Sequence, residues 1–443
     1  IGVIVVVTIV IKQKTIFKKT FDLLGFIKKE NLFDGSYNAY HVLRENRIDK
    51  HTIVFDRNEI GRGIEIDTEN KNVILRLQLP ATKNDIELFY HIAKEIAVEL
   101  GLAYFFCEGT KFTFDEIQTC IDKDEKSSIQ ILENIEKKIY LTGDNNIVLF
   151  CALHPITFGE KEIDEVEGSL SSFAKLLNRL QNQRLYYAVP AIYQKRTGGM
   201  IVAFHVDEEM PTVLPVEPVI YGPNKIELKD WFIFFAGGNT IRLETFYEYV
   251  PRKEYYDSNH YAVCLSEKDI CELVENHSEN LATGKTIKGY YFGMIIDSAD
   301  LYQNDNKQDP LAPYSHIAII LEYCYKNNLL NDKFNEAVPE FGRVIDRKED
   351  LREFVKNNRY IAGEVRIGFF NSTTRAFIDA YYNLDGEGYL NDLKVYGTST
   401  GQSKGFLDIP YTEKNIENIE KIIKRAENLY FSQKEVDRTE EQI

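Results

Sequence analysis

The sequence lacks the residue patterns that most often mark a catalytic or metal centre. It has no GxSxG, HExxH or CxxC motif, and its six cysteines are scattered, mostly inside apolar runs such as "VLFCAL". A structural zinc site needs closely spaced cysteine and histidine ligands, so the spacing argues against that class of protein. Free thiols in apolar surroundings are typical of a reducing compartment. We therefore expect a cytoplasmic protein without a cofactor or a metal ion.

Proline and glycine are also scarce, at 12 and 26 of 443 residues. Apolar residues make up 44% of the chain and aromatic residues 12%, which is the composition of a folded globular protein rather than a disordered one. The length suits two or three domains.

The opening stretch "IGVIVVVTIVI" (1–11) is too short for an ordinary membrane span, which needs roughly 17 to 25 apolar residues. Ten of its eleven residues are β-branched, which favours a buried strand. Lysines follow the run from Lys12 onward, as they would beside a membrane anchor. We therefore expect a strand, and we keep a membrane-tethered scaffold as an alternative.

The charge is strongly one-sided. The formal net charge is -16, although the first 29 residues carry an excess of lysine. An acidic body repels phosphate backbones, which argues against nucleic-acid binding and favours a basic protein partner.

The pattern of apolar residues predicts an α+β fold with a largely antiparallel sheet, amphipathic helices and a smaller, mostly helical C-terminal domain. Strand-like runs occur in uneven clusters, without regular βαβ alternation. Helices are predicted at 82–101, 168–185 and 266–276, and "YYFGMII" at 290 and "FLDIPY" at 406 read as strands.

Changes in composition divide the chain into five segments. We expect an apolar extension at 1–7, an α+β domain at 8–296, a polar linker at 297–313, a mostly helical domain at 314–431 and a solvated tail at 432–443.

Five side chains are candidates for binding. Four are polar or aromatic groups near predicted strand ends. The fifth opens an apolar helix, a position that favours a capping or core histidine over a ligand. The five are Gln181, Tyr187, Asp230, Trp231 and His316. The first four would also be the first candidates for an active site assembled from distant residues.

Several motifs of the N-terminal two thirds resemble the bacterial domain-of-unknown-function family 4299. They include "TIVFDRNEIGRGIEI" (52–66), "LQLPATKNDIELFY" (77–90), "GSLSSFAKLLNRLQ" (168–181) and "YYAVPAIY" (186–193). The resemblance covers roughly residues 8–265 and implies no activity. Members of that family begin close to "TIVIKQK", which implies that Thr8 to Lys12 form the first strand.

The C-terminal third is similar to a second uncharacterised bacterial family, through "SHIAIILEYCYKNNLL" (315–330) and "STTRAFIDAYY" (372–382). That family occurs in toxin-immunity gene neighbourhoods. The sequence therefore favours a non-catalytic protein-interaction protein of the immunity type, whose partner is basic or toxin-like. An enzyme with an unrecognised active site is the main alternative.

Overall fold

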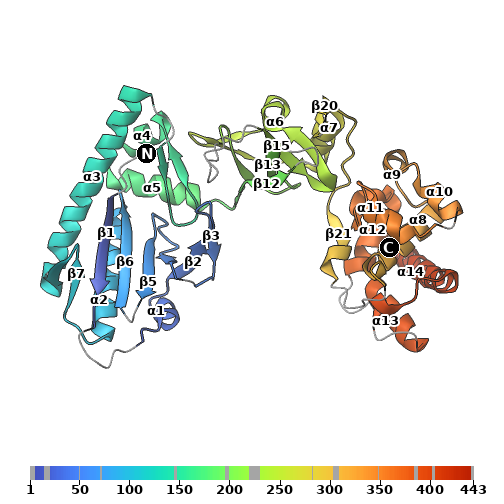
Figure 1. Ribbon diagram of the computed structural model, residues 1–443, viewed down its shortest axis with the longest axis horizontal. Coiled ribbons are helices and arrows are strands. Elements are labelled where there is room, and N and C mark those ends of the chain that lie inside the picture. Colours follow the sequence, from blue (N-terminus) through green and yellow to red (C-terminus); the bar gives the residue numbers. More distant parts are fainter. Residues whose placement is uncertain are drawn as a thin grey trace. The chain divides into compact units, whose positions relative to one another are not determined.

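The computed structural model describes residues 5–13, 20–48, 50–69, 72–143, 147–194, 199–218, 230–281, 283–302, 309–347, 349–383, 388–401 and 405–440 (Figure 1). The fold class is α+β, as the sequence predicts. The chain forms two compact units, each discontinuous in sequence. The first consists of Ile1–Val189, Pro211–Glu227 and Arg252–Cys264, and the second of the remaining segments. The five segments expected from composition stay predictions.

An eight-stranded antiparallel sheet is the centre of the described part of the first unit. Its order is β3-β2-β4-β5-β6-β1-β7-β8. The strands are β1 (Val5–Ile11), β2 (Phe33–Tyr37), β3 (Leu43–Glu45), β4 (Thr52–Phe55), β5 (Ile64–Glu69), β6 (Asn72–Leu79), β7 (Tyr104–Cys107) and β8 (Thr110–Thr113).

Strand β1 answers the question raised by the apolar opening stretch. It lies inside the sheet, paired with β6 and β7, and Val7, Ile9 and Ile11 are buried. The strand includes residues 5–7, which were expected to be an extension, because their backbone continues the pairing with β6 as far as Leu79. Residues 1–4 lie outside the described part. None of the described helices is long and apolar enough to cross a membrane.

The helices of the first unit pack on this sheet and on one another. They are α1 (Leu23–Lys29), α2 (Lys83–Glu99), α3 (Ile117–Thr142), α4 (Glu160–Val166) and α5 (Leu170–Gln181). Helix α2 contacts β1, β6 and β7 (Figure 1). It begins with a capping box in which Thr82 Oγ1 accepts from the Asp85 backbone N–H at 3.0 Å and Asp85 accepts from the Thr82 N–H at 3.1 Å.

Two smaller sheets complete the described first unit. One pairs β9 (Ile147–Leu149) with β10 (Ile156–Phe158). The other has the order β11-β14-β18-β17, formed by β11 (Tyr186–Tyr187), β14 (Thr212–Pro215), β18 (His260–Val263) and β17 (Glu254–Asp257).

The second unit begins with a four-stranded sheet of order β12-β13-β15-β16. Its strands are β12 (Ala191–Gln194), β13 (Met200–His205), β15 (Trp231–Phe235) and β16 (Asn239–Arg242), accompanied by α6 (Leu243–Tyr249) and α7 (Glu267–His277). Short pairs of strands follow, β19 (Glu279–Asn280) with β20 (Lys285–Thr286), and β21 (Ile295–Ser298) with β22 (Glu364–Arg366).

The strand predicted at 290 was wrong for most of its length, because Gly293 takes a positive φ of 69° and Phe292 turns into the helical core.

The C-terminal part of the second unit is mostly helical, as predicted. Its helices are α8 (Ser315–Lys326), α9 (Asp332–Ala337), α10 (Phe341–Asp346), α11 (Leu351–Asn357), α12 (Ser372–Asn383), α13 (Tyr389–Ser399) and α14 (Glu413–Glu440). The strand predicted at "FLDIPY" was wrong, since Phe406–Asp408 form the 3-10 turn η6, closed by a hydrogen bond from the Asp408 N–H to Gly405 O. The backbone of the expected tail continues α14 to Glu440, and residues 441–443 lie outside the described part.

Candidate functional site

Gln181, the first sequence candidate, is a buried link between three segments of the first unit. It ends α5 and is 2% exposed. Its Nε2 donates to Gly61 O at 2.8 Å, and its Oε1 accepts from the Leu153 N–H at 2.8 Å. These bonds satisfy buried backbone groups, which is a structural role.

Tyr187 lies at one end of a chain of buried polar groups. His260 Nδ1 is 2.7 Å from Asp257 Oδ1, and the Tyr187 hydroxyl is 2.9 Å from His260 Nε2. A carboxylate only accepts, so Nδ1 donates to it and Nε2 accepts from the phenol. The His154 ring stacks on Tyr187 at 4.7 Å. This order of groups is that of an acid–base relay, and burial raises the pKa of the Tyr187 phenol still further above its ordinary value. The hydrogen bonds and ring contacts of this network hold together β11, the turn between β17 and β18, and the segment that contains His154. This is a structural role.

Asp230 and Trp231 stand at the start of β15 in the second unit. Trp231 is buried, and its ring stacks on Phe204 at 5.7 Å. Asp230 Oδ1 accepts from the Arg242 guanidinium at 3.4 Å. Both side chains therefore have partners that belong to their own sheet.

His316 is an interior residue of α8. Its Nε2 is 2.9 Å from Asp297 Oδ2, and both side chains are 2% exposed. The Tyr302 hydroxyl donates to the other oxygen of Asp297 at 2.8 Å, and the ring of Phe406 meets His316 edge-on at 5.3 Å. A side chain so enclosed does not reach a partner protein from the folded state. The five sequence candidates thus belong to separate structural networks, distributed over both units.

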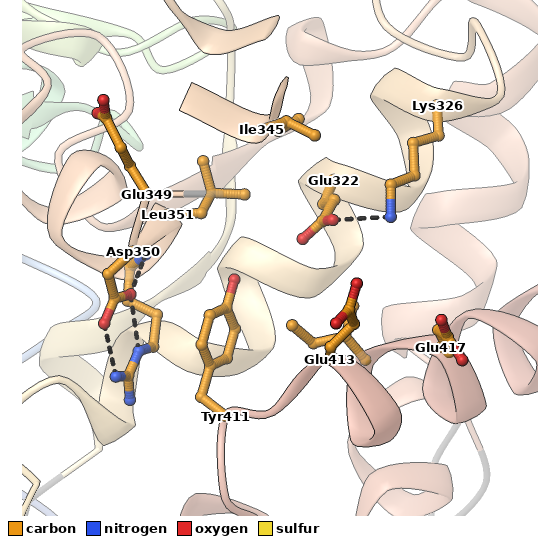
Figure 2. Close-up of a pocket in the computed structure, with 11 residues that line it drawn as sticks. Glu322, Lys326, Ile345, Glu349, Asp350, Leu351, Tyr411, Glu413 and Glu417 are labelled. Carbon is orange, nitrogen blue, oxygen red and sulfur yellow. Dashed lines mark hydrogen bonds and ion pairs between the residues drawn. The ribbon is translucent and has the colours of Figure 1, made fainter. Parts of the chain in front are cut away.

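A hollow in the helical part of the second unit is a stronger candidate (Figure 2). It has a volume of about 510 Å³ and lies between α8, the turn from α10 to α11, and the start of α14. Its lining consists of Glu322, Lys326, Ile345, Glu349, Asp350, Leu351, Arg352, Tyr411, Glu413, Ile416 and Glu417. We call it the first hollow.

The first hollow has an excess of negative charge. Among the described residues, five carboxylates and two cations line it, and both cations are already engaged. Lys326 Nζ lies 2.7 Å from Glu322 and 2.9 Å from Glu420. Arg352 lies 2.7 Å from Asp350 and 2.6 Å from Asp309. A further cation would therefore meet carboxylates whose charge is not fully compensated.

Glu413 and Glu417 project from the first turns of α14 toward the first hollow (Figure 2). Glu417 is exposed and forms no ion pair with any described residue. Burial is the largest single influence on Asp350 and opposes its ionisation, but the hydrogen bonds and the positive charge of Arg352, together with backbone N–H groups, hold the pKa of Asp350 below its usual range. Asp350 therefore stays ionised at neutral pH.

Apolar and aromatic groups line the same hollow. Ile345, Leu351 and Ile416 contribute aliphatic surface. The Arg352 guanidinium lies 4.5 Å from the centre of the Tyr411 ring, which is a cation–π distance. Burial raises the pKa of Tyr411, so its ring is uncharged. A long basic side chain fits this combination, because it carries an aliphatic stem and a terminal positive charge.

None of the residues that line the first hollow was a sequence candidate. The local signal is weak: "TEKNIENIE" places two of the carboxylates four residues apart on one helix, and "KEDLRE" supplies two more.

The fold and this hollow define an α+β protein whose mostly helical C-terminal part carries an acidic concave surface. The chain belongs to the family described as a domain of unknown function (DUF4299), whose model matches residues 6–273. A second domain of unknown function (DUF7832) matches residues 295–404, so both resemblances seen in the sequence are confirmed. No curated protein and no solved structure matches the chain. Of the hollow, residues 322–352 lie inside the second match and residues 411–417 follow it.

Proposed function

We propose that the protein is a non-catalytic interaction protein that binds a positively charged segment of a partner protein in the first hollow. The observation that carries this proposal is the excess of carboxylates around a hollow whose two cations are already paired. The net charge of -16 adds a long-range attraction for basic partners.

The lining favours a side chain over a bare metal ion. Hard cations such as Ca²⁺ prefer a shell of oxygen ligands, whereas Ile345, Leu351 and Ile416 give this hollow an apolar surface as well. Lysine and arginine use both kinds of surface at once.

A basic protein toxin is the partner class that the C-terminal resemblance favours, and the cytoplasm is the compartment. The second point is supported by the six cysteines, all of which are free thiols.

The proposal is tested by affinity capture from the host with the full-length protein and with a Glu413→Gln, Glu417→Gln double variant. Both side chains are exposed, so the double variant keeps the fold while removing two charges. The control is a Glu272→Gln variant, which removes one charge at an exposed position on α7, away from the hollow. We expect one soluble basic protein to be retained by the wild type and the control and lost by the double variant. Equal capture by all three proteins would contradict the proposal.

A further inference from the structure

A second hollow lies beside the first and shares a wall with it. It has a volume of about 860 Å³, and Glu349 and Asp350, in the turn between α10 and α11, line both hollows. The remainder of its lining is Glu340, Val344, Glu353, Phe354, Asn357, Asn358 and Arg359. The two hollows therefore lie on either side of this turn, and we call the pair the acidic groove.

The second hollow repeats the chemistry of the first. Four carboxylates and one cation line it among the residues that the structure describes. Glu353 is exposed and forms no ion pair with any described residue, as is the case for Glu417 in the first hollow. The guanidinium of Arg359 lies 4.3 Å from the centre of the Tyr360 ring.

Neighbouring residues of α10 and α11 supply apolar surface to both sides. Val344 lines the second hollow and Ile345 the first, while Phe354 lines the second and Leu351 the first. Each hollow thus offers aliphatic or aromatic surface next to an exposed carboxylate that is free to pair with a ligand.

We propose that the groove binds one continuous segment of the partner protein that carries two basic side chains, one for each hollow. The charges pair with Glu417 and Glu353, and the aliphatic stems lie on Ile345 and Leu351 in one hollow and on Val344 and Phe354 in the other. This inference rests on the proposed function and adds that recognition is bivalent and depends on spacing.

Bivalence has a measurable consequence. Once the first side chain is bound, the second binds as an intramolecular event at high effective concentration, so two weak contacts combine into a stronger one. The gain is largest when the spacer between the basic residues matches the groove and falls when the spacer is shorter or longer.

The test is isothermal titration calorimetry with the full-length protein at low salt. The probes are Gly–Ser peptides that carry one arginine, or two arginines separated by spacers of increasing length. We expect one spacer length to bind at least about tenfold more tightly than the single-arginine peptide. Glu353→Gln and Glu417→Gln should each reduce this peptide to the affinity of the single-arginine peptide, whereas Glu272→Gln should leave it unchanged.

The outcomes separate this inference from the proposed function. If the two-arginine peptides show no preferred spacer, or if only Glu417→Gln weakens them, bivalent binding is overturned while a single basic contact in the first hollow stands. If no peptide binds, and capture of a partner does not depend on Glu413 and Glu417, both proposals fail. Circular dichroism of each variant verifies that the fold is retained.

Discussion

His316 Nε2 lies 2.9 Å from Asp297 Oδ2 in the interior of the second unit, where it joins the start of α8 to β21. Removing His316 takes one hydrogen bond from a buried carboxylate, and a hydrogen bond to a charged group is worth about 1.5 to 3 kcal/mol. Asp297 keeps its bonds from Tyr302 and from the Ser298 N–H. We therefore expect His316→Leu to lower the free energy of unfolding by about 2 kcal/mol, measured by urea denaturation.

The matched control is His205→Gln, an exposed histidine of the same unit. It should change the free energy of unfolding by less than about 1 kcal/mol. A His316→Leu variant as stable as this control would show that the pair does not stabilise the unit.

His154 makes the stability of the first unit depend on pH. Burial lowers its pKa from 6.5 to about 4, so between these pH values the unfolded chain binds more protons than the folded one. The part of the free energy of unfolding that depends on a neutral His154 is therefore fully present above pH 6.5 and is lost as the pH falls toward 4. It amounts to roughly 3 kcal/mol. The check is urea denaturation at several pH values in this range.

The comparison is a His154→Gln variant, which removes the titrating group. Its free energy of unfolding should fall less steeply with decreasing pH than that of the wild type. Parallel pH profiles for the two proteins would exclude His154 as the source of the dependence.

Gln181 should contribute to stability and not to binding. Gln181→Ala leaves the Leu153 N–H without its partner, whereas Gly61 O keeps the bond from the Ala152 N–H. An unsatisfied donor in the protein interior costs about 1 to 3 kcal/mol. Gln183→Ala, at an exposed position two residues later, is the control and should be nearly neutral. Thermal unfolding distinguishes the two variants, and equal melting temperatures would refute the bridging role.

Binding in the acidic groove should weaken as salt is added. The carboxylates Glu349, Glu413 and Glu417 are exposed, and exposed charges are screened over a Debye length that shrinks to about 3 Å at 1 M salt. We expect the affinity for a two-arginine peptide to fall by at least about tenfold between low and high salt. Calorimetry at increasing NaCl measures this, and a constant affinity would indicate that apolar contacts dominate.

The helices that could be predicted are those with local start signals. Thr82 with Asp85, and Ser266 with Asp269, form capping boxes that are written in the sequence three residues apart. Helix α3 was missed because polar side chains interrupt its buried stripe. Asp124 is buried there because the Tyr90 hydroxyl donates to it at 2.7 Å, which is a tertiary contact that no local pattern contains.

The acidic groove escaped prediction for a related reason. Its carboxylates come from α8, the α10–α11 turn and α14, and the fold alone brings Glu322 and Glu417 to one hollow. The sequence does predict the general acidity and the preference for a basic partner, because net charge needs no knowledge of position. The five sequence candidates lie at strand and helix ends, where polar side chains also form hydrogen bonds with buried backbone and side-chain groups.

The discontinuous arrangement of the two units sets the order in which the chain can fold during synthesis on the ribosome. Strand β11 pairs with β14, and β14 pairs with β18, while β12 and β13 of the other unit lie between β11 and β14 in the chain. The small sheet of the first unit is therefore completed only after residue 263 has been translated. A nascent chain released after Val189 would contain β11 without its partner strand. The complete first unit therefore requires segments that are translated well after the strands of its eight-stranded sheet.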